Sequence, residues 1–133
     1  MKRAGYGVLS LVLVGLGASV SAHHSFAAHY DMAKPITVQG AIAEVRLSNP
    51  HSWFFVDVKD ADGKVTRWSF EAGTPSGMIR NGYKASELPQ GTMVTITGFP
   101  ARERANVGML RQLTMAGGKT YGMFGPQEGP AAR

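Results

Sequence analysis

The chain has 133 residues, a formal net charge of +5 at pH 7 and no cysteine. The missing cysteine excludes disulfides, iron–sulfur clusters and thiolate zinc sites, so any metal has to be bound by nitrogen and oxygen atoms. If residues 1–22 are removed, the formal charge falls to about +3, which is too mild to indicate a nucleic-acid partner. The remaining length is typical of one compact domain.

Residues 1–22 have the three parts of a signal peptide. A basic start with Lys2 and Arg3 is followed by an apolar stretch over residues 8–16 and by small residues over 18–22. The apolar stretch is shorter than the roughly 20 residues that a membrane-spanning helix needs. We therefore expect an exported chain, periplasmic or secreted, that is soluble and has no membrane anchor.

The first strand is predicted over residues 36–47. Its apolar residues change phase near Gly40 and Ile42, which indicates a bulge or a bend that glycine permits. Asn49 and Pro50 end this strand, because proline offers no amide hydrogen and forces the residue before it into extended geometry. His51 is expected in or just beyond the turn.

A hairpin follows, with strands over 53–58 and 65–71 joined by the Asp and Gly residues of 60–63. Thr74 and Pro75 predict the start of a short helix that ends at residues 81–82. Two more strands are predicted over 93–99 and 109–115. From Gly122 onward the composition is typical of disorder, so we expect a domain over 23–121 and a tail over 122–133.

Three strands, one short helix and two further strands, with a kinked first strand, are the element order of an all-β, five-stranded, OB-like Greek-key barrel. The alternative is an open five-stranded sheet packed by one helix. An OB-type barrel binds ligands on strands two and three and on the loops after strands one and four. In this chain those loops are residues 48–51 and 100–108.

Several side chains of that region are candidates for ligand binding. Arginines at the barrel mouth could meet an anion, although isolated surface arginines are commonly solvated. Large aromatic residues on strands are usually core, and Trp68 with Phe70 is assigned to the core for that reason. The candidate ligand-binding residues are Arg46, Asn49, Trp53, Arg102 and Arg104.

Two pairings between distant residues are also expected. Trp53 and Trp68 lie on adjacent strands and are expected to pair across them. Glu71 and Arg80 are expected to form an ion pair that closes the helix against the sheet. A catalytic role for Glu71 would need a partner that the sequence does not identify.

An ordered series of short motifs spans nearly the whole mature chain: HHSF at 23–26, Tyr30 with Asp31, NPHS at 49–52, WSFE at 68–71, RNGY at 80–83 and GFPA at 98–101. With these motifs the chain resembles a family of exported bacterial proteins catalogued only as a domain of unknown function. The resemblance implies secretion and a small β domain, without an established activity. More distantly, the layout is similar to that of small periplasmic OB-fold proteins, which are binding modules.

The candidate metal ligands are the only four histidines, His23, His24, His29 and His51. Cleavage after Ala22 would leave the α-amine and imidazole of His23 to chelate one Cu(II), with a second imidazole from His24, His29 or His51, an arrangement called a histidine brace. Cleavage after residue 21 would place His24 third, where it suits square-planar Cu(II) or Ni(II). Alternatively, His23 and His24 are flexible terminal residues, and His51 is a turn histidine bonded to nearby backbone.

The sequence thus predicts an exported binding or accessory module, with copper at the N-terminal histidines as its specific ligand. Nothing in the sequence requires catalysis. One alternative is a copper oxidoreductase in which His23 and either His51 or His29 form the brace. The other is a metal-free structural partner of an envelope complex.

Overall fold

The computed structural model describes residues 26–122. The predicted signal peptide, the candidate ligands His23 and His24, and residues 123–133 of the predicted tail lie outside the described residues. The elements, in chain order, are α1 (Phe26–His29), β1 (Ile36–Arg46), β2 (Trp53–Lys59), β3 (Val65–Glu71), α2 (Pro75–Arg80), the 3-10 helix η1 (Ala85–Glu87), β4 (Met93–Pro100), β5 (Val107–Met115) and β6 (Thr120–Gly122).

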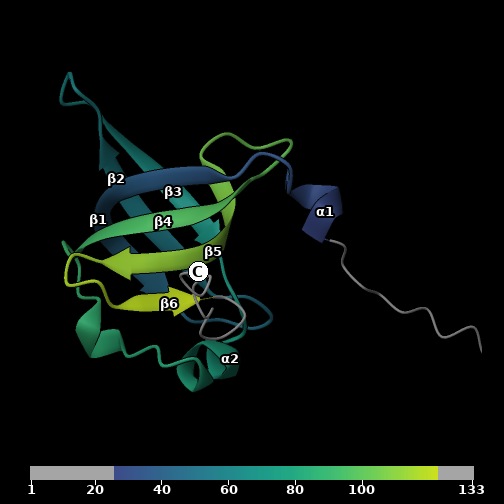
Figure 1. The fold of residues 1–133 in the computed structure, drawn as a ribbon, viewed down its shortest axis with the longest axis vertical. Coiled ribbons are helices and arrows are strands. Elements are labelled where there is room, and N and C mark those ends of the chain that lie inside the picture. The colour runs from purple at the N-terminus through teal and green to yellow at the C-terminus, as the bar shows by residue number, and fades with distance from the viewer. Residues whose placement is uncertain (1–25, 123–133) are drawn as a thin grey trace, which may run out of the picture.

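Five strands form a closed barrel (Figure 1). The sheet order is β3-β2-β1-β4-β5-β6, and a parallel pairing of β3 with β5 joins Ser69 to Val107 and Glu71 to Met109. All other strand pairs are antiparallel. The predicted OB-like, all-β barrel is confirmed, and the β3–β5 pairing rules out the open sheet.

The first strand pairs with two neighbouring strands. Residues 36–41 pair with β4, and residues 41–46 pair with β2. The register shifts between Ile42 and Glu44, which confirms the bulge. Gly40 permits the close crossing, because a Cβ atom there would lie 2.4 Å from the carbonyl oxygen of Asp57.

Alternate residues of most strands fill the barrel interior, as the two-residue period of a strand requires, whereas β5 buries the consecutive residues Met109 and Leu110. Phe70 is fully buried, and the ring of Trp68 stacks on it at a centroid distance of 5.7 Å while remaining partly exposed. The expected pairing of the two tryptophans is wrong, because the register places Trp53 opposite Glu71 and Trp68 opposite Val56. The buried strand residues are Val38, Ile42, Phe54, Val56, Phe70, Val94, Ile96, Met109, Leu110 and Leu113.

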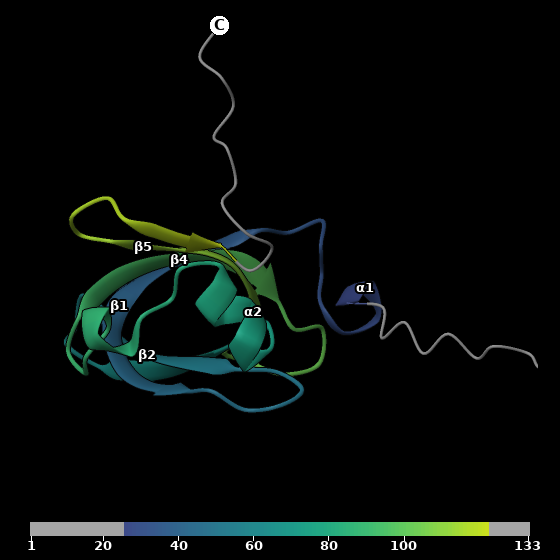
Figure 2. The same ribbon diagram turned by 90° about the horizontal axis from the view of Figure 1, so that it is seen from below.

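Helix α2 covers one end of the barrel (Figure 2). The Thr74 hydroxyl accepts a hydrogen bond from the amide of Gly77, and Pro75 occupies the first helical turn, so the predicted cap is confirmed. Met78, which is 1% exposed, is the helix's buried residue. Its burial joins α2 to the barrel core.

Three elements carry too weak a pattern to be predicted. Helix α1 has four residues, and η1 and β6 have three each. β6 pairs with β5 at the edge of the sheet. Glu87 of η1 accepts hydrogen bonds from Tyr121 and Lys119. Gly122, where the predicted tail begins, is the last residue of this strand. No helix among the described residues is long and apolar enough to cross a membrane.

The close approach of β4 to β5 gives a test of the barrel geometry. A Cβ atom at Gly98 would lie 2.2 Å from the carbonyl oxygen of Met109, a backbone atom that cannot move aside as the end of a flexible side chain could. We expect Gly98→Ala to lower the free energy of unfolding by about 1–3 kcal/mol, because the strands must separate. The measurement is urea unfolding followed by circular dichroism.

Gly117→Ala is the matched control, since a Cβ atom at Gly117 would have nothing within 4 Å. It should change the free energy of unfolding by less than about 0.5 kcal/mol. Equal stability of the two variants would contradict the close packing of β4 on β5.

Candidate functional site

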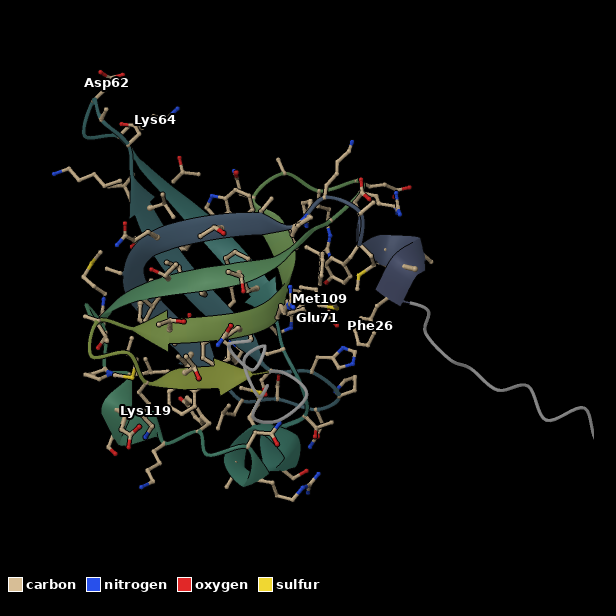
Figure 3. The ribbon with its side chains drawn as sticks, viewed as in Figure 1. Phe26, Asp62, Lys64, Glu71, Met109 and Lys119 are labelled. Carbon is tan, nitrogen blue, oxygen red and sulfur yellow. The ribbon has the colours of Figure 1, made fainter. Side chains whose placement is uncertain are left out.

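A cavity of about 430 Å³ lies between α1 and the barrel. Its residues come from α1, from the turn before β2, from the end of β3 and from the loop between β4 and β5. Figure 3 shows Phe26 on the side of α1 that faces the barrel, near Glu71. We call this cavity the α1 pocket; its lining residues are Phe26, His29, Tyr30, Pro50, His51, Glu71 and Arg104.

Backbone hydrogen bonds attach α1 to the loop between β4 and β5. The amide of Asp31 donates to the carbonyl of Pro100 at 2.9 Å, and the amide of Arg102 donates to the carbonyl of His29 at the same distance. Between these bonds, Tyr30 forms an isolated bridge with Ala101. This bridge and the two hydrogen bonds beside it hold the segment against the barrel, which fixes one wall of the pocket.

Glu71 is the central side chain of the pocket. The hydroxyl of Tyr30 donates to its Oε2, and Nδ1 of His51 donates to its Oε1. The Glu71 side chain is only 13% exposed, whereas that of His51 is 32% exposed. In the neutral ring the proton lies on Nδ1, so Nε2 carries the lone pair that can bind a metal ion or accept a proton.

The turn that carries His51 is itself fixed at both sides. The hydroxyl of Ser48 donates to the carbonyl of His51 at 2.8 Å. The next residue, Ser52, is fully buried, and its amide donates to the carbonyl of Gly73 at 2.9 Å. The ring of Phe26 lies 6.2 Å from the His51 ring, measured between centroids. These contacts hold the imidazole at the pocket wall.

Tyr30 is held in its protonated form. Burial is the main cause that raises the pKa of its phenol well above the usual value, and the hydrogen bond to Glu71 and the charge of that carboxylate act in the same direction. The positive charge of Arg104 opposes them and lowers the pKa, which indicates that Arg104 is electrostatically close to this phenol. Tyr30 is therefore a donor to Glu71 throughout the physiological pH range.

Arg104 is exposed on the loop between β4 and β5. It borders the α1 pocket and also a second hollow of about 240 Å³ on the outer face of β2, which is lined by Arg46, Trp53, Phe55, Ser69, Arg104 and Val107. Within residues 26–122 its guanidinium has no hydrogen bond or ion pair with another side chain. It is thus a cation without a structural partner in that part of the chain.

The other candidate ligand-binding residues have different surroundings. Arg46 is bonded to Glu44, with 2.8 Å from Nη2 to Oε1, and lies over the Phe55 ring at 5.0 Å. Arg102 donates from Nε to the carbonyl of Ala27 and lies 3.8 Å from Asp31, so its contacts attach α1. Asn49 is exposed in the turn and is not a lining residue of the α1 pocket.

The expected ion pair between Glu71 and Arg80 is wrong, because the Glu71 oxygens bind Tyr30 and His51 instead. The predicted hairpin could in part have indicated the contact between Glu71 and His51. Its register places Glu71 opposite Trp53, two residues from His51. No sequence pattern indicated the hydrogen bond from Tyr30 to Glu71, since the two residues lie 41 positions apart and the β4–β5 loop holds the tyrosine in place.

His29 and His51 both line the α1 pocket. In the part of the chain that the structure describes, however, no three His, Cys, Asp or Glu side chains are grouped closely enough to hold a metal ion.

The comparisons with known proteins give a family but no activity. The model of DUF6152, a family of unknown function, matches residues 11–111, a range that includes every lining residue of the α1 pocket. A comparison with curated proteins finds no match. The function therefore has to be argued from the site.

The raised pKa of Tyr30 predicts a change of stability in alkaline solution. The folded state keeps the phenol protonated, so its contribution is complete below about pH 10 and is lost as the pH rises further, when the unfolded chain ionises. We expect the free energy of unfolding of Tyr30→Phe to fall less steeply above pH 10 than that of the wild type, by up to about 1.4 kcal/mol per pH unit.

Urea unfolding at pH 7 to 11 measures this difference. At pH 7 the variant should also be less stable by about 1–3 kcal/mol, because Glu71 loses a donor in a partly buried place. Tyr83 and Tyr121 contribute a slope of the same sign in both proteins, since the pKa of each is raised mainly by burial. Identical slopes for wild type and variant would contradict the environment described for Tyr30.

Proposed function

Since this chain belongs to DUF6152, a family of unknown function, its membership supplies no activity, and we propose from the site that it is an exported binding module that holds one Cu(II) ion at the α1 pocket. Export is supported by the three-part pattern of residues 1–22. The ion is bound by the amine and imidazole of His23, as the first residue of the mature chain, and by Nε2 of His51.

The observation that carries the proposal is the bond between His51 and Glu71. A histidine that binds a metal through one ring nitrogen commonly donates the other N–H to a carboxylate, which fixes the tautomer and makes the ligand more basic. His51 has this arrangement before any metal is added.

The position of Phe26 supports His23 as the second donor residue. Phe26 lines the pocket, and its ring lies 6.2 Å from that of His51. His23 precedes Phe26 by three residues, a length of chain that spans at most about 11 Å. An amine at residue 23 is thus within reach of the pocket, and His24 is the alternative source of a further nitrogen.

The donor types favour copper over other transition metals. The chain has no cysteine, and amine and imidazole nitrogens suit Cu(II), which also binds most tightly among the divalent first-row metals. Glu71 is not needed as a ligand, because both its oxygens already accept hydrogen bonds. The proposed site is therefore made of nitrogen donors, with the carboxylate orienting one of them.

The first test varies the N-terminus. Protein secreted with its native start is compared with protein that carries one extra N-terminal methionine, and Cu(II) binding is measured by calorimetry and electron paramagnetic resonance. We expect one equivalent bound by the native form and an affinity at least about tenfold lower for the extended form, because the amine is displaced. Equal affinities would rule out a site that depends on the amine.

The same samples distinguish the two other functions that the sequence leaves open. Copper-dependent oxidation of a reductant, lost in His23→Ala, would favour an oxidoreductase over a binding module. Absence of bound copper at micromolar protein would favour a metal-free structural partner.

The second test varies the histidine at the pocket. His51→Ala should remove one nitrogen from the resonance spectrum and lower the affinity for Cu(II) at least about tenfold. Glu71→Gln keeps the imidazole but weakens its orientation, so we expect a loss of about 10–100-fold. His29→Ala is the matched control with one histidine removed from the same pocket. Losses of similar size for His29→Ala and His51→Ala would indicate unspecific binding by exposed histidines.

A further inference from the structure

The α1 pocket contains a positive charge that its own residues do not neutralise. Its carboxylate, Glu71, is already bonded through both oxygens, to Tyr30 and to His51. Arg104 borders the same pocket and forms no ion pair with any side chain of residues 26–122. Its effect on the pKa of Tyr30 indicates that the guanidinium acts on the pocket interior and not only on solvent. A bound anion would therefore find a cation that is still available.

The rest of the pocket is mainly apolar. Phe26 and Tyr30 lie with their ring centroids 6.5 Å apart, and Phe26 also approaches the His51 ring. Pro50 forms a further part of the lining. Cavities of a few hundred Å³ with apolar walls and a few polar groups are the usual form of small-molecule sites. The volume of about 430 Å³ falls in that range.

We propose that the α1 pocket binds an organic monocarboxylate with a compact apolar body. The carboxylate pairs with the guanidinium of Arg104, whose planar fork of N–H donors matches two carboxylate oxygens. The apolar body packs against Phe26, Tyr30 and Pro50. This binding does not require copper, because it uses the loop arginine and the apolar wall and no histidine nitrogen.

The charges in the pocket favour a monoanion over a phosphate. Glu71 carries a negative charge beside Tyr30 and His51, and Arg104 is the one cation in the lining that is always charged. A dianionic phosphate would place two further negative charges near Glu71 against this single arginine. A carboxylate adds one charge, which Arg104 balances.

Calorimetry on the mature protein, treated with EDTA to remove metal, tests the proposal. The probes are phenylacetate and 4-methylpentanoate, with phenylacetamide as the neutral analogue, acetate as the anion without an apolar body and phenyl phosphate as the dianion. We expect at least one of the two acids to bind, and the three comparison probes to bind at least about tenfold more weakly, because each lacks one feature or adds a charge.

Substitutions assign the binding to the pocket. Arg104→Ala should weaken the bound acid at least about tenfold, and Arg104→Lys should restore part of the loss. Arg111→Ala removes another exposed arginine, which lies on β5 outside the pocket lining, and should leave the affinity unchanged. Circular dichroism verifies that each variant is folded.

Three results would overturn the proposal. They are failure of both acids to bind at millimolar concentration, equal binding of phenylacetate and phenylacetamide, and unchanged affinity in Arg104→Ala. Because metal is absent throughout, these results leave the copper proposal untouched, and a failure of copper binding would likewise leave the carboxylate proposal standing.

Discussion

The parallel pairing of β3 with β5 is the constraint on which the rest of the molecule depends. It closes the barrel and removes two strand edges that would otherwise expose unpaired backbone groups. The strands approach closely there because Phe70 packs over Gly108, where a Cβ atom would lie 2.9 Å from the ring. The same pairing places Glu71, at the end of β3, beside Met109 near the start of β5. Closure thus fixes where Glu71 lies relative to β5.

The α1 pocket depends on a second attachment, made by residues that precede the barrel. Tyr30 is 2% exposed and belongs to the core, although it lies outside the named strands. Its ring contributes apolar burial, while its hydroxyl donates to Glu71. Loss of that segment would expose apolar surface and leave a partly buried carboxylate with one donor fewer. Tyr30 therefore contributes both to the stability of the fold and, through Glu71, to the orientation of His51.

The two arginines of the β4–β5 loop differ in their bonding partners. Arg102 bonds to the carbonyl of Ala27 and lies near Asp31, so its side chain fixes α1. Two residues later, Arg104 has no such partner within residues 26–122 and borders the pocket. A guanidinium already bonded to protein oxygens gains little from a ligand, whereas a solvated one keeps its donors free for an incoming carboxylate.

The sequence by itself determined the barrel, because strand alternation, the Asp and Gly residues of turn 60–63, the Thr74 cap and the phase change near Ile42 are local patterns with periods of a few residues. It also placed His51 in the turn before β2, where the structure has it. Only the tertiary structure decided that Glu71 binds Tyr30 and His51 instead of Arg80, and that β6 exists. The Tyr30 contact joins residues 41 positions apart that only the folded barrel brings together, and the His51 contact needs the exact register of the β2–β3 hairpin. A three-residue strand is too short to show a period.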